Sequence, residues 1–138
     1  MNKTLLALQD YAKDFYSNTE FGDSNIVGSP LGSWLLVASV ASSLDFGSNP
    51  ALKAETENRL HMSIEEAKEA VEDLLEQYRE LNYVAQAWTT PNLNSLPAVQ
   101  KWVEANTLIP HEGSIPSQEQ INKWAATNTN DLIKEFPA

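Results

Sequence analysis

The sequence predicts a mainly helical α+β fold with a small sheet, formed as a single domain over residues 1–138. Three observations lead to this expectation. Apolar residues recur at the three- and four-residue spacing of amphipathic helices, and several of these segments begin with a capping residue. Between residues 81 and 90 the spacing changes to the alternation typical of a strand. Residues 25–44 contain no charged side chain, which indicates a helix at the centre of the core.

The composition limits the classes of function. The 138 residues carry a net charge of -10, from 19 acidic and 9 basic side chains, and 42% of them are hydrophobic, as in a folded chain. Nucleic acids are bound by clustered Lys and Arg, and because the chain has no such cluster, no nucleic-acid partner is expected. The absence of cysteine excludes disulfides, thiol nucleophiles and thiolate metal sites.

The N-terminus lacks the long apolar run of a secretion signal. We therefore expect a cytoplasmic protein, or a mature secreted form numbered from an added Met. Ser, Gly and Pro residues interrupt the uncharged run at 25–44, so it falls short of the roughly 18 consecutive apolar residues of a membrane span. No membrane partner is expected.

Two helices are predicted in the first 44 residues. Residues 2–18 have apolar side chains at helical spacing, and Ile26-Val27 could add a short strand after them. Ser29 is expected to cap the next helix, with Pro30 at its first position, where the missing N–H costs nothing. Apolar residues cover nearly the whole circumference of this helix. We expect it to be buried on all sides, with these residues in the core: Leu35, Leu36, Val37 and Val40.

Two more helices follow. Asn49-Pro50 predicts the start of a helix that continues to Leu60. Ser63 and Glu66 have the spacing of a capping box, and the apolar stripe behind them predicts a helix to about Leu81. Its other face carries five acidic residues, Glu65, Glu69, Glu72, Asp73 and Glu76. We interpret them as a solvated face, because a calcium site needs a loop that folds oxygen atoms around the ion.

The last third combines short strands and helices. The predicted elements are a strand at 81–90, a turn at 91–94, a helix at 95–104 and a strand at 107–110. Pro110 confines the second strand to an edge or an end of the sheet. Ser117 and Gln120 form a second capping box, which begins a helix. One face of this helix is expected to carry Ile121, Trp124, Ala125, Asn128 and Leu132.

No set of residues predicts catalysis, and we expect no enzyme. Ser29 has Val27 and Leu31 at the two positions where a nucleophile elbow needs glycines. The two histidines, His61 and His111, share no metal-ligand spacing with each other or with a pair of carboxylates. No glycine-rich phosphate loop is present, so no metal or cofactor is expected.

Two segments carry a resemblance to a known family. In Asn25-Ile26-Val27-Gly28-Ser29-Pro30-Leu31, an Asn and an apolar pair precede a Ser-Pro that begins a helix of small residues. In the second segment, Ile121-Asn122-Lys123-Trp124 is followed by Thr129 and Ile133. The first resembles the start of the buried helix B of the serpins, the serine protease inhibitors, with Asn25, Ser29 and Pro30 as shutter-like residues. The second resembles serpin helix F, which lies across the front of the large sheet A.

The resemblance implies the N-terminal part of a serpin-like fold, with helices A to F. Residues 83–90 resemble the second strand of sheet A, 97–106 helix E and 107–111 the first strand. Where family members usually carry a second serine, three residues after Ser29, this chain has Gly32. Serpins inhibit when a protease cleaves their reactive-centre loop and the loop inserts into sheet A. The chain ends where a third strand would begin, so we expect it to lack this loop and not to inhibit on its own.

Two functions remain open. The first is an N-terminal fragment or domain of a serpin-type inhibitor, whose full-length parent acts on a serine protease. The second is a free-standing helical interaction and dimerisation module that retains the serpin N-terminal fold. In a serpin the third strand would cover one edge of the second. We expect a homo-oligomer formed through that edge, because no charge discourages pairing in these residues: Tyr83, Val84, Ala85, Gln86, Ala87, Trp88 and Thr89.

Overall fold

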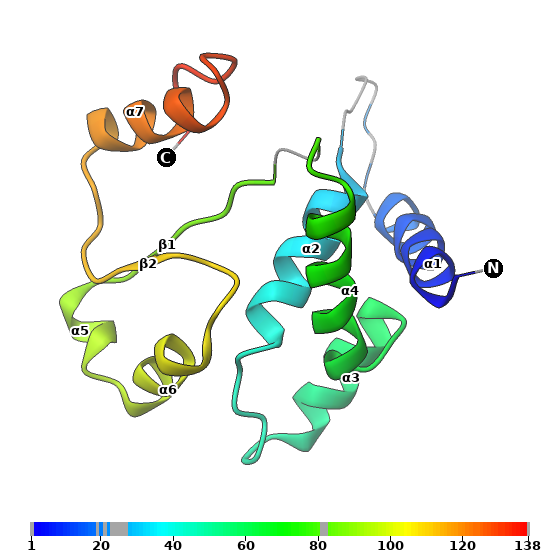
Figure 1. The fold of residues 1–138 in the computed structure, drawn as a ribbon. Coiled ribbons are helices and arrows are strands. Elements are labelled where there is room, and N and C mark those ends of the chain that lie inside the picture. The colour runs from blue at the N-terminus through cyan, green and yellow to red at the C-terminus, as the bar shows by residue number, and fades with distance from the viewer. Residues whose placement is uncertain (1, 19, 21, 23–27, 81–82, 138) are drawn as a thin grey trace. The chain divides into compact units, whose positions relative to one another are not determined.

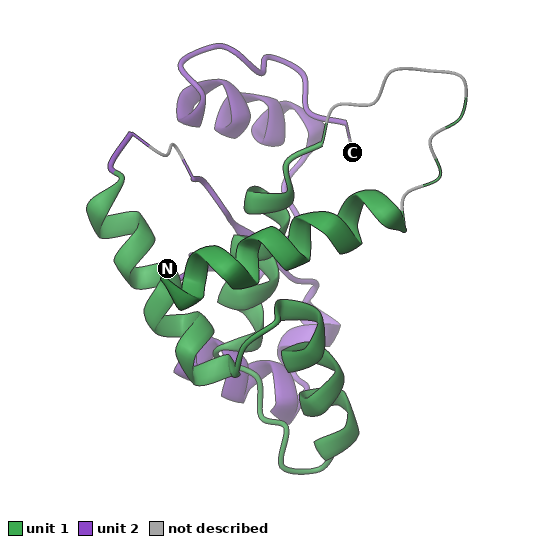
Figure 2. Ribbon diagram, turned by 90° about the vertical axis from the view of Figure 1, so that its right-hand side faces the viewer, with its two compact units in different colours: residues 1–78 green, residues 79–138 purple. Residues whose placement is uncertain are grey.

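The computed structural model describes residues 2–18, 20, 22, 28–80 and 83–137. Within these ranges the chain is mainly helical, with seven helices and one parallel sheet of two short strands. It divides into two compact units, Met1–Tyr78 and Arg79–Ala138, which Figure 2 colours separately. That the units together form one domain stays a prediction. No helix of the described part has the length and apolar character to cross a membrane.

The first unit consists of four helices, labelled in Figure 1. Their bounds are Lys3–Ser17 for α1, Pro30–Ala41 for α2, Pro50–Leu60 for α3 and Ile64–Gln77 for α4. All four were predicted, and only the end of α4 differs, since it stops at Gln77 instead of continuing to Leu81. α2 packs against the other three helices. The short strand predicted at Ile26-Val27 lies outside the described residues.

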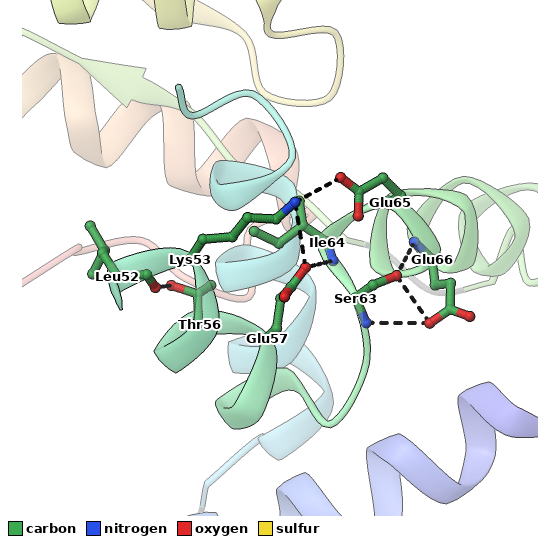
Figure 3. A network of polar contacts seen from close by, with 8 residues as sticks. All are labelled: Leu52, Lys53, Thr56, Glu57, Ser63, Ile64, Glu65 and Glu66. Atoms are coloured by element: carbon green, nitrogen blue, oxygen red, sulfur yellow. Dashed lines mark hydrogen bonds and ion pairs between the residues drawn. The ribbon is translucent and has the colours of Figure 1, made fainter. Parts of the chain in front are cut away.

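The predicted N-terminal caps are confirmed. Ser29 Oγ accepts a hydrogen bond from the Gly32 N–H at 3.1 Å, and Pro30 occupies the first position of α2. Ser63 and Glu66 form a reciprocal capping box at the start of α4 (Figure 3). Each cap satisfies an N–H group that has no partner within its own helix.

A charged network joins α3 to the start of α4 (Figure 3). Lys53 Nζ lies 3.2 Å from Glu65 Oε1 and 3.8 Å from Glu57 Oε1. Glu57 in turn accepts the Ile64 N–H at 3.1 Å. The hydrogen bond and the charge of Glu65 raise the pKa of the Lys53 ammonium above its ordinary value. The first turn of α4 is therefore held by side chains of α3 as well as by its own capping box.

The expectation that α2 is buried on all sides was wrong. Leu35 is buried, but the side chains of Leu36 and Val37 are 48% and 37% exposed, and Val40 is half-buried. The apolar residues of α2 point in every direction, whereas its three neighbouring helices cover only part of its circumference. The covered part centres on Trp34, which is fully buried and donates its indole N–H to the Leu60 carbonyl at 3.1 Å.

The end of α3 has an unusual residue in a common motif. His61 has a left-handed backbone conformation with φ of 56°, and its N–H bonds to the Asn58 carbonyl at 3.3 Å. The next N–H, of Met62, bonds to the Glu57 carbonyl at 3.2 Å. This is a Schellman motif, in which glycine is the usual left-handed residue. A side chain at this position allows His61 Nε2 to lie 2.7 Å from Asp14 Oδ2, which links α1 to the end of α3.

The second unit contains the sheet and three helices. The helices are α5 (Pro91–Asn94), α6 (Pro97–Ala105) and α7 (Gln118–Asn128), and the strands are β1 (Ala87–Trp88) and β2 (His111–Glu112). The strands run parallel, with Ala87 opposite His111 and Trp88 opposite Glu112. The capping box of Ser117 and Gln120 is confirmed at the start of α7.

Both strands differ from the prediction. β1 covers two residues of the expected strand at 81–90; residues 83–86 are irregular, and 81 and 82 lie outside the described part. The second strand was expected at 107–110 and lies at His111–Glu112 instead. Asn106 explains this shift, because its Oδ1 accepts the N–H groups of Leu108 and Ile109 at 3.2 and 3.0 Å. These two N–H groups are held in a turn.

The end of α7 also corrects a prediction. Leu132 was expected on the same helix face as Trp124 and Ala125, but α7 ends at Asn128 and the Leu132 side chain is 86% exposed. Asn130 and Asp131 follow with positive φ values of 51° and 61°, which no helix accommodates. The chain therefore turns away before Leu132 reaches the helix face.

Candidate functional site

The sheet of the second unit brings together two of the three groups of residues singled out in the sequence. The expected self-association strand contains β1, and the motif of Ile121, Asn122, Trp124 and Thr129 lies on α7 and at its C-terminus. In the third group, Ser29 and Pro30 begin α2 in the other unit, and Asn25 lies outside the described residues. The candidate site is therefore the sheet with the helices that pack on it.

One face of the sheet is covered by α7. The rings of Trp88 on β1 and Trp124 on α7 meet edge to face, with centroids 5.2 Å apart and planes at 79°. The ring of Phe136 also meets that of Trp124, with centroids 6.4 Å apart. Aromatic pairs in this geometry attract beyond the area that they bury. α7 is thus attached to the strand through one aromatic cluster.

The polar residues of the α7 motif hold the C-terminal segment against the helix. Asn122 Oδ1 accepts the Phe136 N–H and the Gln118 side-chain amide, both at 2.9 Å. The Gln118 amide also donates to the Phe136 carbonyl at 2.7 Å. Thr129 Oγ1 accepts the Ile133 N–H at 2.9 Å. These bonds place Phe136 beside Trp124, while Ile121 is half-buried on the same helix.

The opposite face carries a polar cluster that the sequence did not predict. Thr89 Oγ1 lies 2.7 Å from His111 Nε2 and donates to the side-chain oxygen of Asn94. The Asn94 amide donates to the Gly113 carbonyl at 2.7 Å. These residues come from the end of β1, α5, β2 and the turn after β2, and Thr89 and His111 are 22 positions apart. Only the pairing of the two strands brings them together.

The hydrogen-bond pattern of this cluster does not suit nucleophilic catalysis. A hydroxyl has one proton, and the Thr89 proton is directed to Asn94. His111 Nε2 must then carry a proton and donate it to Thr89. A threonine nucleophile requires the reverse, an imidazole that accepts the hydroxyl proton. The cluster braces α5 against the strands.

Close packing supports this structural role. A Cβ atom at Gly113 would lie 2.8 Å from the Asn94 side-chain nitrogen, so a larger residue there would displace the amide. On the same face of the sheet, the ring of Trp102 on α6 meets that of His111, with centroids 6.4 Å apart. Figure 1 shows α7 on one side of the two strands and the pair α5 and α6 on the other. Helices therefore contact the sheet from both sides.

The two edges of β1 differ in their hydrogen bonding. The N–H groups of Ala87 and Thr89 bond to the carbonyls of Pro110 and Glu112 at 2.9 and 3.1 Å, which pairs this edge with the β2 segment. Backbone groups of successive strand residues point to opposite edges, so the N–H of Trp88 points away from β2, as does that of Gln86 if the alternation extends one residue before β1. Among the residues that the structure describes, neither group has a hydrogen-bond partner. We call this the free edge of β1.

The described ranges contain no group of three His, Asp or Glu side chains that could hold a metal ion. No protein-family model, curated protein or solved structure matches the chain.

Proposed function

We propose that residues 1–138 are the N-terminal part of a serpin-type serine protease inhibitor. In this role they are a scaffold: they supply helices A to F and the first two strands of the sheet into which a cleaved reactive-centre loop inserts. The serine protease is the partner of the full-length parent. The proposed role includes no catalysis by this chain and no cofactor.

The contact between Trp124 and Trp88 is the observation that carries this proposal. The resemblance relates Trp124 to helix F and Trp88 to the second strand of sheet A, and in a serpin helix F lies across the front of that sheet. Here the corresponding helix places its Trp124 ring on the Trp88 ring, 5.2 Å away between centroids. The resemblance rests on residue patterns alone, so this contact supports the proposal independently.

The arrangement of the remaining elements supports the proposal further. The helix that begins at Ser29 and Pro30 holds the centre of the first unit through the buried Trp34. In the second unit, β1 and β2 fall in or next to the segments that resemble the second and first strands of sheet A, and they pair directly. The segment that resembles helix E forms α6 between them.

The complete reading frame that encodes these residues tests the proposal. We expect it to continue beyond Ala138 into a third strand, a hinge and a reactive-centre loop. The full-length product should form an SDS-stable covalent complex with a trypsin-like or subtilisin-like protease. Residues 1–138 alone are the control and should form none, because they contain no loop for the protease to cleave. A stop codon after Ala138, or a complex with the control, would contradict the proposal.

A second candidate function is a free-standing interaction module that retains this fold. The free edge of β1 favours it, since unpaired backbone N–H and C=O groups are a template for another strand. For this function no protease is a partner, and a reading frame that stops at Ala138 is expected.

A further inference from the structure

We propose that two copies of residues 1–138 pair through the free edge of β1, antiparallel and about a two-fold axis at Gln86. The result is a four-stranded sheet in which the two β1 segments are central. This inference names the partner of the interaction module, and its biological role rests on that second candidate function. The free edge of β1 is part of residues 1–138, so the pairing can be tested on this chain whichever function is correct.

The packing of the sheet selects the edge as the interaction surface. Trp124 of α7 covers the face that carries Trp88. Trp102 of α6 covers the face that carries His111. The other edge of β1 already bonds to Pro110 and Glu112. On β1 the N–H groups of Gln86 and Trp88 then remain to be satisfied, and another strand can satisfy them with regular hydrogen bonds.

The position of the two-fold axis follows from the sequence of the segment. Residues 83–89 carry no charge, and Gln86 is their midpoint. An axis there pairs this segment with its own copy over its whole length, with Gln86 opposite Gln86 and Val84 opposite Trp88. All of these are residues whose backbone groups point to the free edge if the alternation of β1 continues through the segment. The Gln86 N–H of each copy would then donate to the Gln86 carbonyl of the other.

A second copy suits this edge electrostatically. Residues 79–138 carry six acidic and four basic side chains, whereas residues 1–78 carry thirteen acidic and five basic ones. Most of the net charge of -10 therefore lies outside the unit that pairs, and salt screens it within about 10 Å at 0.1 M. A short strand buries less than the roughly 1,200 Å² of a stable interface, so we expect association at high micromolar concentration.

Sedimentation velocity at increasing concentration tests the proposal with two substitutions at one position. Gln86→Pro removes the outward N–H and leaves the inward bond of Ala87 in place, so the dimer should be lost. Gln86→Ala keeps the N–H and should dimerise as the wild type does. A wild-type chain that stays monomeric at high micromolar concentration would overturn the proposal. So would a Gln86→Pro variant that still dimerises.

A cysteine test covers the case in which the proline disturbs folding. The chain has no cysteine, so one introduced thiol reports one position. Gln86→Cys should give an intermolecular disulfide on mild oxidation, because the two-fold axis places the residue opposite its own copy. Ala98→Cys, exposed on α6, is the control and should give little. Equal cross-linking at both positions would overturn the two-fold pairing. Neither result bears on the reading frame, which separately tests the inhibitor proposal.

Discussion

Trp124 meets Trp88 edge to face, with ring centroids 5.2 Å apart, and this contact attaches α7 to the sheet. The two residues are 36 positions apart in the sequence. Phe136 joins the same cluster because Asn122 and Gln118 hold its backbone. A contact of this kind between distant segments can be tested by measuring its coupling energy.

Trp124→Ala should lower the free energy of unfolding by about 2 kcal/mol. Fully buried Trp side chains cost about 3–5 kcal/mol on truncation, and this one is half-buried. In a double-mutant cycle with Trp88→Ala, the coupling should be about 0.5–1.5 kcal/mol, as for other aromatic pairs. Urea unfolding followed by circular dichroism measures both values. A coupling near zero would show that the two rings do not interact.

Adjacent leucines of α2 should respond very differently to truncation. Leu35 is 2% exposed, so Leu35→Ala should cost about 2–5 kcal/mol through lost burial and a cavity. Leu36 is 48% exposed, so Leu36→Ala should cost no more than about 0.5 kcal/mol. The two variants remove the same atoms from the same helix and control for each other. Equal losses in urea unfolding would mean that another part of the protein covers Leu36.

Ser29→Ala should destabilise the protein by about 1 kcal/mol, because the Gly32 N–H loses the side-chain oxygen that caps α2. Ser29→Asp provides another cap and should restore most of the loss. The hydroxyl serves as an acceptor at a helix end, and we expect it to have no catalytic role. A fluorophosphonate probe should therefore leave Ser29 unlabelled in the folded protein, and labelling would disprove this assignment.

The Lys3–Glu66 pair should make stability depend on pH in the acid range. The hydrogen bond from the Lys3 ammonium, followed by those from Ser63, lowers the pKa of the Glu66 carboxyl below its ordinary value. A carboxyl with a lower pKa in the folded state adds stability above its unfolded pKa, and this is lost as the pH falls through the folded value. Glu66→Gln should therefore be less stable than the wild type at pH 7.

That difference should shrink as the pH falls through the lowered pKa of the Glu66 carboxyl, because the wild-type side chain then also becomes neutral. Thermal unfolding at several pH values measures it. Lys3→Gln is the matched control: it removes the other partner and should reduce the acid dependence that Glu66 contributes. A difference between Glu66→Gln and wild type that stays constant with pH would show that the charge of the Glu66 carboxylate adds no stability.

Sequence patterns predicted the local features of this fold well. Ser29, Ser63 and Ser117 each cap the helix that follows, and the predicted helices begin within a residue or two of their expected starts. α5 was not predicted as a helix, because residues 91–94 were expected to form a turn. In a cap a side chain bonds to the backbone N–H three residues later, so both partners lie within one short stretch of sequence and the cap can be predicted from it. The strand predicted at 81–90 has no such local basis, and it shortened to the two residues that find a partner in β2.

By itself the sequence determined the helices, their first turns and the uncharged segment that contains β1, because these depend on neighbouring residues. Only the tertiary structure decided that Leu35 is buried while Leu36 is exposed, since this depends on which helices surround α2. It alone brought His111 to Thr89 and left the N–H of Gln86 on the free edge. Both follow from the register of β1 against β2, which is a contact between distant segments that no local spacing encodes.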